Sequence, residues 1–119
     1  MDKNDIKVSF TILVHNEDES LKKLLEQINS IKTTWDEIVI VHDGVPTNPK
    51  TIELFEKYKS ESIRIYEHPL NGDFAAQKNF ADNQCKNPYI FNIDADELMD
   101  ANLSTSFREI LFINQDVEY

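Results

Sequence analysis

Four short apolar segments, separated by stretches with helical periodicity, limit the fold of this chain most strongly. They are rich in β-branched residues and cover residues 6–14, 37–41, 62–67 and 89–93. Near-continuous apolar strands that alternate with helices are typical of a parallel sheet buried on both faces. The sequence therefore predicts an α/β fold with a mostly parallel, Rossmann-like sheet and helices on both of its faces.

The segments between these strands carry apolar residues at spacings of three and four, which predicts helices. Asp18 to Ser20 can cap the first helix, and Asn48-Pro49 is typical of an N-cap followed by proline at the first helical position. The residues expected to face the sheet are Leu21, Leu24, Leu25 and Ile28 in the first helix, Ile52, Phe55 and Tyr58 in the second, and Phe74, Ala81 and Cys85 in the third, over 74–86. A last helix over 103–113 and the start of a fifth strand at 116–119 are also predicted.

Composition excludes several classes of function. The formal net charge of −10 argues against a nucleic-acid partner. Only two glycines are present, Gly44 and Gly72, so neither a G-x-G-x-x-G fingerprint nor a P-loop can be formed. No apolar run approaches the ~20 residues of a transmembrane helix. The single cysteine, Cys85, excludes an internal disulfide and indicates a small buried apolar residue in a reducing, cytoplasmic setting.

Polar residues follow the predicted strands where each one ends. In parallel sheets, ligands bind beyond the carboxyl ends of the strands, at the point where strand order reverses. The residues concerned are His15, Asn16 and Glu17 after the first strand, His42, Asp43 and Gly44 after the second, His68 and residues 71–73 after the third, and Asp94, Asp96 and Glu97 after the fourth. The sequence therefore predicts a ligand site at this rim of the sheet.

The D-x-D triplet of Asp94 and Asp96 is informative through its position. Eleven aspartates among 119 residues produce about one such triplet by chance. Two carboxylates ~4 Å apart repel by about 4 kcal/mol at an effective dielectric of 20, so in a cleft they need a cation. That cation is either a basic side chain or Mg²⁺ or Mn²⁺, which both suit oxygen ligands. The alternative is a solvated acidic loop without a ligand, and Glu97 has no derivable role.

The other rim residues each allow two interpretations. Asp43 is either a turn aspartate before Gly44 or a hydrogen-bond acceptor for a base or ribose. His15 is a plain loop residue or stacks on a base, and Asn16 caps the first helix or contributes to the rim site. Lys78 is a solvated lysine or contacts a phosphate.

A phosphatase of the haloacid dehalogenase type is a further alternative, because such enzymes also place D-x-D after a strand. It would make Asp94 the nucleophile and Asp96 the general acid. Only 23 residues follow Asp96, too few for the other motifs that this chemistry needs. The strand concerned is also the fourth and not the first, which argues against this alternative as well.

Four motifs together resemble glycosyltransferase family 2, whose members have the GT-A fold. They are VSFTILVHNEDESLKKLLEQI (8–28), DEIVIVHDG (36–44), NGDFAAQKNFA (71–81) and YIFNIDADE (89–97), and the resemblance covers roughly residues 6–100. It is similar in particular to a bacterial branch that builds lipopolysaccharide core and other surface glycans. The resemblance implies strand order 3-2-1-4, a nucleotide-sugar donor, usually a UDP-sugar, with Mn²⁺ or Mg²⁺, and a glycan or lipid-linked acceptor.

Carried over by position, the resemblance gives each candidate residue a role. His15 would lie near the base, Asp43 would recognise uracil, and Lys78 would approach the nucleotide. Asp94 would lie near the ribose, and Asp96 would be the metal ligand. Two features depart from the family pattern: His42 stands where an acid is usual, and the turn GVPTNP (44–49) lacks the common serine-threonine-aspartate pattern.

Enzymes of this family continue well beyond the D-x-D. The expectation is therefore a single domain over residues 1–119 that forms the donor-binding half, either a cut piece or a natural remnant. The acceptor site and the catalytic base would lie beyond Tyr119, with the enzyme cytoplasmic and at the inner face of the membrane through its acceptor. The alternative is a catalytically inactive GT-A-like binding module, which an exposed sheet edge would allow to pair as a homo-oligomer.

Overall fold

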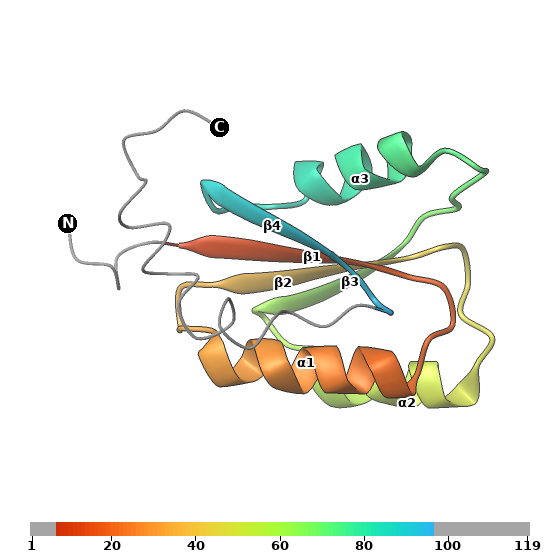
Figure 1. Ribbon diagram of the computed structural model, residues 1–119, viewed down its shortest axis with the longest axis horizontal. Helices are drawn as coiled ribbons and strands as arrows, with labels where there is room; N and C mark the ends of the chain where they lie inside the picture. Colours follow the sequence, from red (N-terminus) through yellow and green to blue (C-terminus); the bar gives the residue numbers. More distant parts are fainter. Residues whose placement is uncertain (1–6, 97–119) are drawn as a thin grey trace.

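A computed structural model describes residues 7–96, which form one four-stranded parallel sheet and three helices (Figure 1). The elements are β1 (Val8–Val14), α1 (Glu19–Ile31), β2 (Glu37–His42), α2 (Pro49–Tyr58), β3 (Ile63–Glu67), α3 (Phe74–Asn83) and β4 (Tyr89–Asp94). The strand order is β3-β2-β1-β4, and every neighbouring pair is parallel. The predicted α/β fold and its 3-2-1-4 order are confirmed. The predicted last helix and fifth strand lie outside the described residues.

Helices cover both faces of the sheet, as expected (Figure 1). Helices α1 and α2 lie on one face, where they bury alternate residues of the strands in the larger core cluster. Helix α3 lies on the other face, where Val39, Val41 and Ala81 form a smaller cluster. Successive side chains of a strand point to opposite faces, so a strand covered on both sides encloses every side chain. Apolar residues suit such positions, and the buried polar residues Ser9 and Thr11 of β1 are hydrogen-bonded. This accounts for the unbroken apolar run at the centre of β2.

Polar side chains begin each helix. Asp18 accepts a hydrogen bond from the backbone N–H of Glu19. Asn48, directly before Pro49, accepts one from the backbone N–H of Lys50. The side-chain amide of Asn48 also donates to Asp18, at 3.1 Å. This hydrogen bond, followed by the one from Glu19, lowers the pKa of the Asp18 carboxyl. The predicted starts of α1 and α2 are therefore confirmed, and their two caps bind one another.

Two helical residues expected to face the sheet are exposed. Ile52 of α2 is 40% exposed, because Thr51 occupies the buried position and donates to the carbonyl of Glu17 at 2.6 Å. Phe74, the first residue of α3, is 67% exposed. The buried residues of α3 are Gln77 and Ala81, and half-buried Cys85 lies beyond the end of the helix. Counting only apolar residues overlooked Thr51 and Gln77, which are buried because their polar atoms are hydrogen-bonded.

The two edge strands differ from β1 and β2. The side chains of β4 alternate in burial, and Ile90 and Asn92 are exposed, so this strand is not buried on both faces as its composition suggested. Strand β3 forms the opposite edge of the four-stranded sheet. Pairing of two copies through a sheet edge stays a prediction. Across residues 7–96, no helix has both the length and the apolar character needed to cross a bilayer.

A charged network holds the connection between α3 and β4 against the sheet. The nearly buried carboxylate of Glu37 accepts from Ser9 Oγ at 2.6 Å, from the N–H of Lys86 at 2.5 Å, and from Arg64. Arg64 also donates to the carbonyl of Gln84 at 2.7 Å. Burial alone would raise the pKa of Glu37, but these hydrogen bonds together outweigh it and lower the pKa. The network therefore fixes where β4 starts and, through it, where the acids at the end of β4 lie.

Candidate functional site

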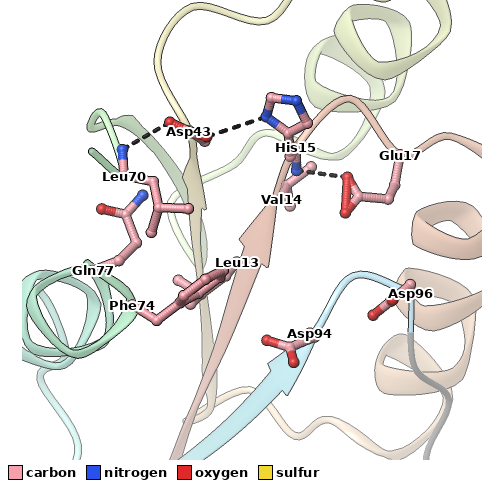
Figure 2. A pocket seen from close by; sticks show the side chains of 10 residues that line it. All are labelled: Leu13, Val14, His15, Glu17, Asp43, Leu70, Phe74, Gln77, Asp94 and Asp96. Atoms are coloured by element: carbon pink, nitrogen blue, oxygen red, sulfur yellow. Dashed lines mark hydrogen bonds and ion pairs between the residues drawn. The ribbon is translucent and has the colours of Figure 1, made fainter. Parts of the chain in front are cut away.

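A cavity of about 400 Å³ lies at the carboxyl ends of β1, β2 and β4, beside the start of α3 (Figure 2). This is the rim at which the sequence predicted a ligand site. The cavity is lined by Leu13, Val14, His15, Glu17, Asp43, Leu70, Phe74, Gln77, Asp94 and Asp96. Four of the six residues with a predicted ligand role are among them: His15, Asp43, Asp94 and Asp96. Glu17, which the sequence analysis also placed at this rim, lines the cavity as well. Asn16 and Lys78 do not line the cavity.

Asp43 connects the end of β1 to the loop before α3. Its backbone N–H donates to the carbonyl of Val14 at 2.9 Å. One carboxylate oxygen accepts from the N–H of Leu70 at 2.7 Å, and the other lies 3.3 Å from Nδ1 of His15 (Figure 2). Each carboxylate oxygen has two lone pairs, so Asp43 can still accept a hydrogen bond from a ligand. The turn and ligand interpretations of this residue are therefore compatible.

His42, which replaces the acid expected by resemblance, is fully buried and bonded at both ring nitrogens. Its Nε2 accepts from the N–H of Asn16 at 3.0 Å, which leaves the proton on Nδ1, 2.9 Å from the carbonyl of Gly44. Gly44 has a φ of +72°, which a side chain would disfavour. The neutral histidine therefore holds the turns that follow β1 and β2 together, a role its sequence position did not indicate.

Asn16 binds the loop before α2 and is not directed at the cavity. Its side-chain oxygen accepts from the backbone N–H groups of Thr47 and Asn48, at 2.9 and 3.1 Å. Its amide donates to Thr47 Oγ1 at 3.1 Å, and its carbonyl accepts from the Asn48 amide at 2.9 Å. Its φ is +58°, which asparagine tolerates better than most residues. Among the described residues, Asn16 thus holds the turn after β1 to the loop before α2, a bracing role behind the site.

Replacing Asn16 by alanine is expected to lower the free energy of unfolding by about 2–3 kcal/mol, because two backbone donors lose their acceptor and φ remains positive. Asn16→Gly should lose less, since glycine adopts this φ without strain. Urea unfolding followed by circular dichroism measures both variants. Asn29→Ala, at an exposed position of α1, is the control and should stay within about 0.5 kcal/mol of the unsubstituted chain. Equal stability of Asn16→Ala and the control would contradict the bracing role.

Gln77 lines the cavity and, like Leu70 and Phe74, was not predicted there from the sequence. It is almost fully buried, and its amide donates to the carbonyl of His68 at 2.7 Å. Its Oε1 lies 2.6 Å from His68 Nδ1, and the His68 ring stacks on Phe80 with 4.0 Å between centroids. A glutamine four residues before Ala81 on the same helical face was the available signal. Gln77 fixes the loop from β3 to α3 against the helix.

The D-x-D acids both line the cavity because the residue between them is anchored to the sheet. Ala95 is fully buried, and its N–H donates to the carbonyl of Leu13 at 3.1 Å. Asp94, the last residue of β4, and Asp96, in the following turn, are exposed, and Figure 2 shows both side chains beside the cavity. With Glu17 and Asp43, they make four carboxylates around one cavity. Glu97 lies outside the described residues.

The donor chemistry of Asp94 and Asp96 fits a hard divalent cation. Within residues 7–96, no three His, Cys, Asp or Glu side chains are grouped closely enough to hold a metal by themselves. Mg²⁺ usually takes only one or two carboxylates and completes its shell with water and substrate phosphates. Two carboxylates at the edge of an open cavity match that pattern, whereas a closed structural site would need more ligands.

Lys78 is exposed on α3, one position beyond Gln77, and does not reach the cavity lining. Burial raises the pKa of the Asp82 carboxyl, and the positive charge of Lys78 lowers this pKa by a smaller amount. In residues 7–96 Lys78 is a solvated lysine, as one of its two interpretations expected. Contact between Lys78 and a nucleotide stays a prediction.

The α/β sheet of order 3-2-1-4, with an acidic cavity at the carboxyl ends of its strands, is the arrangement expected of the GT-A class of fold. A solved structure of residues 1–349 of TarS from S. aureus superposes with a TM-score of 0.74 at 21% identity, over 92% of this chain and 33% of that one. A second solved structure of S. aureus TarS gives a TM-score of 0.76 at 18% identity, over 92% of this chain and 20% of that one. At such identities the likeness concerns the fold, and it confirms the GT-A expectation.

The chain belongs to glycosyl transferase family 2, whose family model matches residues 9–111. It is 34% identical over 114 residues to the lipopolysaccharide core biosynthesis glycosyltransferase LpsC of Rhizobium meliloti (strain 1021), covering 94% of this chain and 40% of the relative. An uncharacterized glycosyltransferase of Rickettsia bellii (strain RML369-C) is 35% identical over 109 residues, with 92% and 34% covered. A poly-beta-1,6-N-acetyl-D-glucosamine synthase of Staphylococcus epidermidis is 27% identical over 93 residues, with 78% and 22% covered. The chain thus spans between 22% and 40% of the length of these relatives, and its predicted family is confirmed.

Proposed function

We propose that this chain is the donor-binding domain of an inverting glycosyltransferase that transfers a sugar from a nucleoside diphosphate, most simply a UDP-sugar, to an acceptor hydroxyl. The observation that carries the proposal is the cavity at the carboxyl ends of the strands, with Asp43 on one side and Asp94 and Asp96 on the other (Figure 2). Family membership supports the reaction class.

The carboxylates explain why the proposal includes a divalent cation. A diphosphate and four carboxylates repel one another in a partly enclosed cavity. Asp96, with Asp94 beside it, would hold Mn²⁺ or Mg²⁺, which when bound neutralises charge on the diphosphate leaving group. Asp94 would also approach the ribose. Asp43 would accept a hydrogen bond from the base. His15 lies against Oδ2 of Asp43, the carboxylate oxygen that does not bind Leu70.

We assign the acceptor site and the catalytic base to residues outside 7–96. The two are assigned together because the base must reach the acceptor hydroxyl. The names of the relatives support a role in lipopolysaccharide or another surface glycan. The acceptor would then be a glycan or a lipid-linked glycan, and the reaction would take place in the cytoplasm at the inner face of the membrane.

Binding of UDP to the unsubstituted chain should require a divalent cation. Isothermal titration calorimetry with UDP is expected to give a dissociation constant below 1 mM, roughly, in the presence of MnCl₂ and no measurable heat of binding in EDTA. ADP in place of UDP is the control for base recognition. Absence of UDP binding at millimolar concentrations in MnCl₂ would contradict the proposed donor site.

A further inference from the structure

Phe74 is an exposed aromatic residue at the wall of the cavity. Its side chain is 67% exposed, although it begins α3 directly beside buried elements. Within residues 7–96 its ring stacks on no other ring, in contrast to Phe80, which packs against His68 and Tyr66. A large apolar side chain that lines a cavity without a partner gains contact when a ligand covers it.

The position of Phe74 is fixed by hydrogen bonds on both sides of it. Asp73, directly before it, caps α3 by accepting from the N–H of Ala76 at 3.0 Å. The N–H of Leu70 is bound to Asp43, and Gln77 holds the backbone of His68. The ring is therefore carried by a segment that is tied to both β2 and α3. The ring is therefore held in place before a ligand binds, so little conformational entropy is lost on binding.

The lining of the cavity changes character from one side to the other. Leu70, Phe74 and Gln77 lie on one side, Asp94 and Asp96 on the other, and Leu13 lies between them (Figure 2). Asp43 adjoins the apolar side through its bond to Leu70. A nucleoside diphosphate has the same division, with a flat heterocycle at one end and an anionic diphosphate at the other. Only one orientation places the heterocycle on apolar side chains and the diphosphate beside the cation-binding acids.

We infer that Phe74 is the platform on which the base of the donor nucleotide stacks, and that it contributes to specificity for a nucleotide over other diphosphates. The inference rests on the proposed function. The base lies against the face of the Phe74 ring, with its polar edge toward Asp43. Stacking is tolerant of base identity because every base has a flat apolar face. Phe74 therefore supplies affinity for the base, and Asp43 supplies the choice among bases.

The test compares UDP with inorganic pyrophosphate, which lacks the base, by calorimetry in MnCl₂. Phe74→Ala is expected to weaken UDP binding about 10-fold, the size of a base–aromatic stack, and to change pyrophosphate binding less than about 2-fold. Phe74→Trp should retain or improve the affinity for UDP. Trp35→Ala removes another exposed aromatic residue, 63% exposed and placed before β2 at the opposite end of the strands, and should change neither affinity.

Unchanged UDP affinity in Phe74→Ala would overturn the inference, and so would an equal loss for UDP and pyrophosphate. Either result leaves the proposed function standing, because the unsubstituted chain would still bind UDP with manganese. If the unsubstituted chain binds pyrophosphate as tightly as UDP, the base is not recognised and the inference is also overturned. Absence of manganese-dependent binding of either compound would overturn both proposals together.

Discussion

Replacing Asp96 by asparagine is expected to weaken manganese-dependent UDP binding by at least about 100-fold. Asparagine keeps the size of the side chain but removes the charged ligand, and even the loss of a group that only supports a metal ligand typically costs 10–100-fold, roughly, in metal affinity. Asp96 is exposed in a turn, so its substitution should leave folding unchanged. Calorimetric titration of UDP at several MnCl₂ concentrations measures the effect.

The control for this prediction is Glu26→Gln, which removes the same charge from an exposed position on α1. Both variants change the net charge from −10 to −9, so a general electrostatic effect would act on them equally. Raising the MnCl₂ concentration should restore part of the UDP binding of Asp96→Asn. Equal affinity of the two variants for UDP would show that Asp96 holds no cation that the donor requires.

Replacing Glu37 by alanine is expected to lower the free energy of unfolding by about 3 kcal/mol or more, the second large effect. Its carboxylate accepts hydrogen bonds from Ser9, Lys86 and Arg64, and its removal leaves the Arg64 guanidinium partly buried without a counter-charge. Urea unfolding measures the loss. Glu56→Ala on the exposed side of α2 should change the unfolding free energy by less than about 0.5 kcal/mol.

The same network predicts how stability depends on pH. The pKa of Glu37 is lower in the folded chain than its ordinary value of 4.5, so the folded state favours the ionised form. Its contribution is therefore complete above pH 4.5 and is lost as the pH falls through the lowered pKa. Unfolding free energies measured between pH 7 and pH 3, roughly, should fall less steeply for Glu37→Ala than for the unsubstituted chain. Parallel curves would contradict the assignment to Glu37.

The elements of the fold could be predicted from the sequence to within a few residues, because apolar periodicity reports burial directly. Strand order came from the resemblance to a family, since periodicity does not say which strands pair. The errors at Ile52 and Phe74 have one cause. Burial in α2 and α3 includes Thr51 and Gln77, which bind backbone carbonyls 34 and nine residues away, and a count of apolar residues does not register such hydrogen bonds.

The candidate site was predicted at the level of the rim, and five of the acidic and histidine residues named there line the cavity: His15, Glu17, Asp43, Asp94 and Asp96. The carboxyl ends of parallel strands necessarily meet at one edge, so this much follows from the order of the elements. Which residue faces the ligand and which holds a neighbouring loop depends on single bonds. Asn16 and His42 bond one another across 26 positions of the chain, and nothing local in the sequence distinguishes them from His15 and Asp43.

Different residues hold the turns and face the cavity, and this has an evolutionary consequence. His42 and Asn16 hold the turns, whereas His15 and Phe74 face the cavity. Exposed His15 and Phe74 can change with little loss of stability, whereas a change at His42 or Asn16 disturbs bonds on both turns. Mutational drift can therefore change the cavity wall while the turns behind it are preserved. Libraries randomised at 15 and 74 should yield many folded variants, and libraries randomised at 16 and 42 few.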